Sequence, residues 1–193
     1  MKFLQPSFEI WQQEAGINGI YRMIERAGRV CYKSENHVDN QSARPFVERL
    51  ITSKHTAMLE HGTVYLVTDQ AKLAERYIQN PFSVVHTLDT KNYITTNLRV
   101  LVEQGWMDDL QYLYKQQPQH EPRITVHFTT QVSITREFNR HRSHSMAEQS
   151  TRYCNYSKDK FGGEININVP EWITNCEKFS ATEQAGNFNM QFI

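Results

Sequence analysis

The feature that most constrains this chain is the stretch 136–153, R-E-F-N-R-H-R-S-H-S-M-A-E-Q-S-T-R-Y, where arginines alternate with small hydroxyl side chains. Arg136, Arg140, Arg142 and Arg152 lie in it, and lysine is absent. A guanidinium is always charged, and its planar set of donors matches phosphate and carboxylate oxygens. A solvated, salt-bridged surface is the alternative reading of a charge run, but such a surface more often mixes Lys with Glu. The composition therefore favours an anion site for a phosphorylated ligand.

Apolar spacing elsewhere predicts both helices and strands. Apolar residues recur at intervals of three and four from Ile17 to Ala27, which predicts a helix that runs into Val30–Tyr32. A second helix is predicted to bury Phe46, Val47, Leu50 and Ile51. Further helices are predicted at 71–78, 97–102 (with Gly105 as its C-cap), 108–114 and 171–179. Ile134 and Phe138 suggest one more helix, which would place Arg136 and Arg140 on one face. Strands are predicted at 3–11 with a break at Pro6, at 64–67, 83–86, 92–95 and 165–169, and at 123–129 with Ile124, Val126 and Phe128 facing inward.

The composition excludes several classes of protein. The 193 residues carry no formal net charge, which argues against general nucleic-acid binding. No apolar run is long enough to cross a membrane or to serve as a signal peptide. Cys31, Cys154 and Cys176 are odd in number and widely spaced, so they predict reduced thiols and no metal site, with Cys154 a small buried side chain. These features predict a single cytoplasmic domain, residues 1–193.

A family resemblance becomes specific within the arginine-rich stretch. The pattern resembles R-H-R-x-x-S-x-N-x-x-S-x-R, the signature of the flavin-dependent thymidylate synthases. Ala147 stands where that family usually has Asn. Two further segments are similar to family motifs: 28–32, with Gly28 in place of an Ala, and 55–61, which follows H-x-S/T-x-x-E-H with Ala57 in place of the hydroxyl. The residues in register with the signature are Arg140, His141, Arg142, Ser145, Ser150 and Arg152.

The resemblance implies an α+β fold, a mostly antiparallel sheet with packed helices. It also implies conversion of dUMP to dTMP, with methylenetetrahydrofolate as carbon donor and NADPH reducing a bound FAD, in a homotetramer. For His61 we expect a structural hydrogen bond. The residues implied for FAD are His55, Arg140, His141, Arg142 and Glu148. Those implied for dUMP are Glu137, Arg140, Glu148, Gln149, Ser150, Thr151 and Arg152, with Glu137 standing where Gln is common.

Two regions depart from the family pattern. Residues 68–122 form an insertion relative to shorter family members. The family continues beyond this chain with a helical region, and one of its arginines is assigned to ionising the uracil. No arginine follows Arg152 in this sequence, so we assign no catalytic residue and expect reduced turnover.

Two alternatives remain open at this point. In the first, the protein is a catalytically impaired relative that binds FAD and nucleotide. In the second, the arginines bind RNA or another polyanion, with Tyr153 and Tyr156 stacking on bases. The zero net charge argues against the second alternative.

Overall fold

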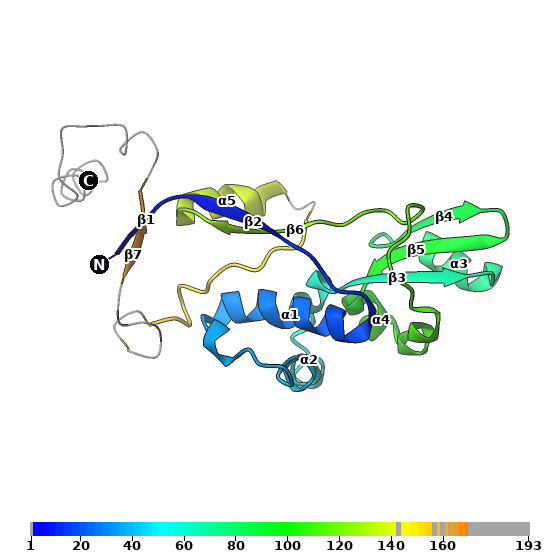
Figure 1. The fold of residues 1–193 in the computed structure, drawn as a ribbon, viewed down its shortest axis with the longest axis horizontal. Coiled ribbons are helices and arrows are strands. Elements are labelled where there is room, and N and C mark those ends of the chain that lie inside the picture. The colour runs from blue at the N-terminus through cyan, green and yellow to red at the C-terminus, as the bar shows by residue number, and fades with distance from the viewer. Residues whose placement is uncertain are drawn as a thin grey trace. The chain divides into compact units, whose positions relative to one another are not determined.

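The structure, a computed structural model, describes residues 2–141, 144–155, 158, 161, 163 and 165–169 (Figure 1). The chain divides into two compact units. The larger unit contains residues 10–125 and the described part of 142–155, and the smaller unit takes its described residues from 2–9, 126–141 and 158–169.

A three-stranded antiparallel sheet forms the centre of the larger unit. Its strands are β3 (Thr63–Thr68), β4 (Val84–Leu88) and β5 (Lys91–Asn97), in the order β3-β5-β4. Every residue of β3 has a partner in β5, from Thr63 opposite Asn97 to Thr68 opposite Asn92. Asp89, with φ of 53°, makes the left-handed turn between β4 and β5. The strands predicted at 83–86 and 92–95 are therefore confirmed, and they pair as a hairpin.

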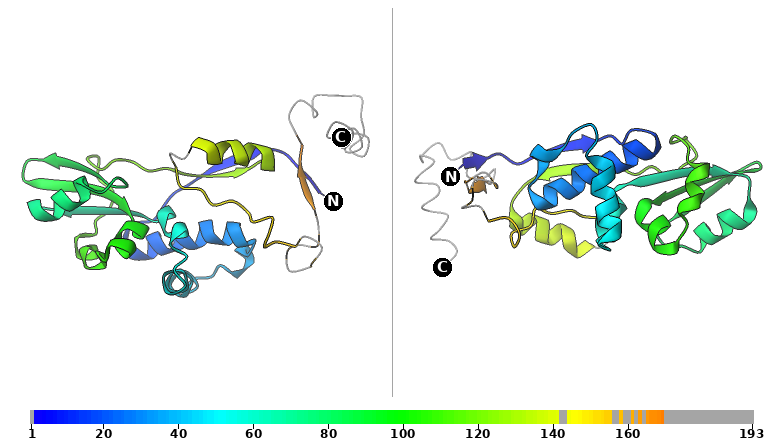
Figure 2. Two further views of the ribbon diagram at one scale, coloured as in Figure 1. Left: turned by 180° about the vertical axis from the view of Figure 1, so that it is seen from behind. Right: turned by 90° about the horizontal axis from the view of Figure 1, so that it is seen from below.

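Helices pack around this sheet and bury the predicted faces. The α-helices are α1 (Gly16–Tyr32), α2 (Ala43–Thr52), α3 (Ala71–Ile78) and α4 (Leu98–Gln104). Three 3₁₀ turns accompany them: η1 (Glu35–His37), η2 (Thr56–His61) and η3 (Met107–Tyr112). Helix α1 packs against α2 and η2, and α3 and α4 pack on the sheet (Figure 2). Ile20, Ile24, Val47 and Leu50 are buried as predicted.

Helix α4 continues directly from the central strand. Asn97 ends β5 and caps α4, because its side chain accepts the Val100 N–H at 3.1 Å. Gly105, with φ of 71°, ends the helix in the left-handed conformation, as predicted. The Leu98 N–H donates to the carbonyl of Gly62 at 2.9 Å, which ties the start of α4 to the end of η2.

The helix predicted at 108–114 is wrong in type and length. The segment forms the six-residue 3₁₀ turn η3 and then becomes extended. The reason is pairing with the edge of β3. Leu113 bridges Leu66, and the Tyr114 N–H donates to the carbonyl of Tyr65 at 2.9 Å.

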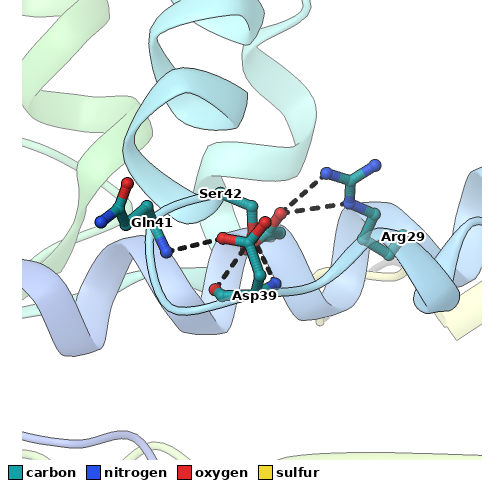
Figure 3. Close-up of polar contacts among 5 residues, drawn as sticks. Arg29, Asp39, Gln41 and Ser42 are labelled. Atoms are coloured by element: carbon teal, nitrogen blue, oxygen red, sulfur yellow. Dashed lines mark hydrogen bonds and ion pairs between the residues drawn. The ribbon is translucent and has the colours of Figure 1, made fainter.

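A buried carboxylate ties the loop before α2 to α1 (Figure 3). Glu25 is 1% exposed and accepts two hydrogen bonds from the Arg29 guanidinium, at 2.9 and 3.1 Å. The Ser42 hydroxyl donates to the other carboxylate oxygen at 2.9 Å. The Asp39 N–H in turn donates to the Ser42 hydroxyl oxygen at 2.9 Å. The buried charge is therefore both paired and hydrogen-bonded.

The described part of the smaller unit contains short strands and one helix. Strand β1 (Lys2–Leu4) pairs in parallel with β7 (Asn166–Asn168). Strands β2 (Ser7–Trp11) and β6 (Thr125–Thr129) form a second pair, and each has one end in the larger unit. The break predicted at Pro6 separates β1 from β2. Helix α5 (Val132–His141) follows β6, as predicted.

The inward orientation predicted for the apolar residues of 123–129 is wrong. Ile124, Val126 and Phe128 are 72%, 36% and 46% exposed. Phe128 packs against Phe8 and Phe138, with ring centroids 6.4 and 5.3 Å apart. In the part of the smaller unit that the structure describes, the β2–β6 pair and α5 leave Val126 and Phe128 partly exposed.

The fold class is α+β with mostly antiparallel sheets, as predicted. The helix predicted at 171–179 lies outside the described residues. Among the described residues, no helix combines the length and apolar character needed to span a membrane.

Candidate functional site

The 55–61 segment forms η2 and is held at both ends by α4. His55 is exposed and occupies the N-cap position of η2. The Thr56 hydroxyl donates to the Glu103 carboxylate at 2.6 Å. At the other end, the Arg99 guanidinium donates to Glu60 at 2.5 Å and to Glu103 at 2.7 Å. We call Thr56, Glu60, Arg99 and Glu103 the α4 clamp.

His61 differs from the prediction of a structural hydrogen bond. Its Nε2 is buried and has no hydrogen-bond partner among the described residues. Burial lowers the pKa of the imidazole, and the neighbouring Glu60 opposes this effect only in part. The imidazole is therefore favoured in its neutral form. Gly62 follows, at a point where any side chain would meet Ile20 and Ile24.

His120 is a buried histidine that the sequence analysis did not single out. Its Nδ1 accepts the Gln117 N–H at 2.9 Å, so Nε2 carries the proton and donates to the carbonyl of Leu66 at 3.0 Å. Tyr65 and Tyr93 contact the ring at centroid distances of 5.0 and 5.4 Å. Burial lowers the pKa of this imidazole too. No sequence pattern marks His120, because the acceptor of its Nε2 proton, the carbonyl of Leu66, lies in a segment distant in the sequence.

These two histidines make a testable prediction about pH. The native state holds both imidazoles neutral, whereas the unfolded chain takes up protons near pH 6.5. Above about pH 6.5 both states are unprotonated at these histidines, and the protein keeps its full free energy of unfolding. Below that pH the unfolded chain binds protons that the native state does not, so the free energy of unfolding falls. We expect urea unfolding to show this loss between about pH 6.5 and 5.5, by up to about 1.4 kcal/mol per pH unit for each histidine. His120→Gln should flatten this slope relative to the wild type. Equal slopes in the two proteins would contradict the prediction.

The second half of the arginine-rich stretch lies against the C-terminal end of α1. The Ser150 N–H donates to the carbonyl of Cys31 at 2.9 Å, and the Cys154 N–H donates to the carbonyl of Ser150 at 3.0 Å. Tyr153 meets Tyr32 edge to face at 5.4 Å. Cys154 is 3% exposed, so its prediction as a buried side chain is confirmed. Burial, and then the nearby Cys154 and Glu148, raise the pKa of the Cys31 thiol.

The residues predicted for dUMP differ in exposure along this segment. Glu148, Gln149 and Ser150 are half-buried, whereas Thr151 and Arg152 are exposed. The Ser150 hydroxyl oxygen accepts the Tyr153 N–H at 3.1 Å, which shapes the turn that carries Arg152. The turn thus presents a guanidinium to solvent on a backbone fixed to α1.

The first half of the stretch lies on α5 in the smaller unit. Glu137 and Arg140 form an exposed ion pair at 3.6 Å, and His141 is exposed at the end of the helix. Arg136 and Arg140 lie four residues apart on the helix, as predicted, and both are exposed. The predicted contact residue Arg142 lies outside the described residues. His55 and residues 148–152 therefore belong to the larger unit, whereas Glu137, Arg140 and His141 belong to the smaller one.

A separate cavity of about 280 Å³ lies in the larger unit. Tyr65, Lys115 and Arg123 are among the residues that line it. The Arg123 guanidinium donates to the carbonyls of Phe82 and Thr96, at 2.8 and 3.2 Å, and burial lowers its pKa. Among the residues predicted to bind FAD or dUMP, none of those that the structure describes lines this cavity.

The fold and the site together define an α+β protein with exposed arginines on a helix and on a fixed turn. Residues 103–191 match the family described as thymidylate synthase complementing protein. The match includes the whole arginine-rich stretch, so the resemblance predicted from the signature is confirmed over this part of the chain, and it supports a function related to thymidylate synthesis. No curated protein matches the chain, and no solved structure matches it.

Proposed function

We propose that the protein is a flavin-dependent thymidylate synthase that converts dUMP to dTMP in the cytoplasm. Methylenetetrahydrofolate is the proposed carbon donor and NADPH the reductant of bound FAD. One observation carries the proposal: the signature from Arg140 to Arg152 lies within the region that matches the thymidylate synthase complementing family. The residues assigned to ligands below follow from the resemblance and are proposals in the same sense.

The proposed flavin residues fit an anionic cofactor. His55, Arg140 and His141 are exposed, and the arginine guanidinium and the imidazole N–H donors suit the diphosphate of FAD. Arg142 and Glu148 complete the proposed set. Bound FAD would supply the redox chemistry, while the residues of the chain bind and orient it.

The proposed nucleotide residues combine charge with hydrogen-bond donors and acceptors. Arg152 and the Ser150 hydroxyl are assigned to the 5′-phosphate or its surroundings. Because Ser150 Oγ accepts from the Tyr153 N–H, its own proton stays available for a phosphate oxygen. The rest of the proposed set comprises Glu137, Arg140, Glu148, Gln149 and Thr151, which would contact base and ribose.

Arg152→Ala tests the nucleotide assignment. A hydrogen bond to a charged group contributes about 1.5–3 kcal/mol, so the dUMP dissociation constant should rise roughly tenfold or more. Titration calorimetry measures this constant. Arg22→Ala, which removes a half-exposed arginine from α1, is the matched control and should bind dUMP like the wild type. Uridine, which lacks the phosphate, should lose most of the binding. Wild-type affinity in Arg152→Ala would remove Arg152 from the site.

The absorbance spectrum of the purified protein tests the proposal as a whole. We expect flavin bands after incubation with FAD and dialysis, together with tritium release from labelled dUMP when NADPH and methylenetetrahydrofolate are present. A protein that keeps no flavin at saturating FAD would refute the proposed function.

We also propose that the protein is a homotetramer and that residues 68–122 are an insertion relative to shorter family members. Exposed apolar side chains of the smaller unit, including Phe8, Phe128 and Val132, support burial between subunits. Light scattering tests the oligomeric state.

The 68–122 segment supplies β4 and the central strand β5, so it is built into the core of the larger unit.

A further inference from the structure

We infer that Arg99 is a positioning residue for His55, and that it acts through the α4 clamp. The inference rests on the proposed function, because it takes His55 as a flavin contact. Arg99 and Glu103 lie on α4, outside the three sequence segments that carry the resemblance. Their contacts with the 55–61 segment are visible only in the fold.

The clamp holds η2 at both ends through a single guanidinium. Arg99 donates to Glu60 at 2.5 Å and to Glu103 at 2.7 Å, and each bond joins a charged donor to a charged acceptor. The same oxygen of Glu103 also accepts the Thr56 hydroxyl at 2.6 Å. Arg99 therefore reaches Glu60 directly and Thr56 through one intervening carboxylate. Charge-assisted bonds of this kind are short and directional.

His55 lies between two fixed points. On one side its N–H donates to the carbonyl of Leu50 at the end of α2, at 2.9 Å. On the other side Thr56 is held by Glu103. The backbone of His55 has φ of −87° and ψ of 58°, outside both the helical and the extended regions. Its own side chain makes no cap hydrogen bond to the backbone. The anchors on either side therefore fix the backbone of His55 and the point from which its imidazole leaves the chain.

The geometry of α4 makes it a suitable support. The helix starts directly from the central strand, and its first N–H bonds the carbonyl of Gly62 at the other end of the motif. A contact residue held by neighbours on regular elements keeps its orientation better than one on an unsupported loop. Loss of Arg99 would leave the carboxylates of Glu60 and Glu103 without the guanidinium that they share.

A double-mutant cycle on FAD affinity tests the inference. The dissociation constant of FAD would be measured by fluorescence quenching for the wild type, Arg99→Ala, His55→Ala and the double variant. Arg99→Ala should weaken FAD about tenfold, comparable to the loss of an orienting partner at metal sites. If Arg99 acts through His55, it should have little further effect in the His55→Ala background. Arg99→Lys should rescue only part of the affinity, because an ammonium lacks the planar fork that reaches two carboxylates.

A milder variant keeps the test valid if Arg99→Ala folds poorly. Thr56→Val removes only the hydroxyl hydrogen bond to Glu103 and should weaken the binding of FAD. Like Arg99→Ala, it should have little further effect in the His55→Ala background. Arg22→Ala again serves as the control, with unchanged affinity expected. Additive losses in the cycle, or wild-type affinity in both Arg99→Ala and Thr56→Val, would overturn the inference and leave the proposed function standing. A wild-type protein that binds no FAD would refute both.

Discussion

Glu25→Ala should lower the free energy of unfolding by about 3–5 kcal/mol, the range typical of breaking a buried ion pair. Glu25 is 1% exposed, and the side chain of its partner Arg29 is 15% exposed. The substitution removes the acceptor of two Arg29 hydrogen bonds and of the Ser42 hydroxyl. It leaves a guanidinium against the ring of Phe46, 4.7 Å from its centroid, without a counter-charge.

Glu48→Ala provides a matched control for this prediction. Glu48 also pairs with an arginine four residues away, Arg44, but at 3.8 Å and with both side chains about 60% exposed. Exposed pairs of this kind contribute about 0.3–0.5 kcal/mol. Urea unfolding at neutral pH would measure both variants. A loss in Glu25→Ala no greater than that in Glu48→Ala would show that the buried pair contributes no more than a surface one.

Leu59→Ala should destabilise the protein by about 2–5 kcal/mol. Leu59 is fully buried in the core cluster of the larger unit and is the buried residue of η2. Truncation removes apolar contacts and leaves a cavity beneath the segment that carries His55.

Leu88→Ala is the control for Leu59→Ala. It makes the same substitution at the end of β4, where Leu88 is 49% exposed. Its effect should stay within about 0.5 kcal/mol, as for most surface positions. Thermal unfolding followed by circular dichroism would compare the two variants. Similar melting temperatures would mean that η2 contributes little to the core.

Periodic segments were predictable because one face of each is buried by neighbours of regular geometry. The spacing from Ile17 to Ala27 defines the buried face of α1, and Asn97 and Gly105 mark both ends of α4. The alternation at 123–129 also predicts a strand correctly. It does not predict which side of that strand is covered, because this depends on elements distant in the sequence. The same limit explains η3, whose helical pattern gives way to pairing with β3.

The candidate site could be proposed from the sequence only as far as local spacing reaches. The signature identifies Arg140, Ser150 and Arg152 because their order along the chain is itself the pattern. The contact between Ser150 and Cys31 joins residues far apart in sequence, as does the bond between Arg99 and Glu60. Neither the α4 clamp nor the neutral state of His120 leaves a signal in the order of residues. Such features arise from tertiary geometry alone.

The direct passage from β5 into α4 has a thermodynamic consequence for ligand binding. Asn97 is the last residue of β5 and the N-cap of α4. No loop therefore separates the sheet from Arg99 and Glu103, the α4 residues that bond to η2. The 55–61 segment is thus ordered before any ligand arrives. A ligand that docks there does not have to immobilise a loop, so association loses less conformational entropy and more of the contact energy appears as affinity. The corresponding cost is rigidity: a segment fixed in this way adapts poorly to ligands of a different shape.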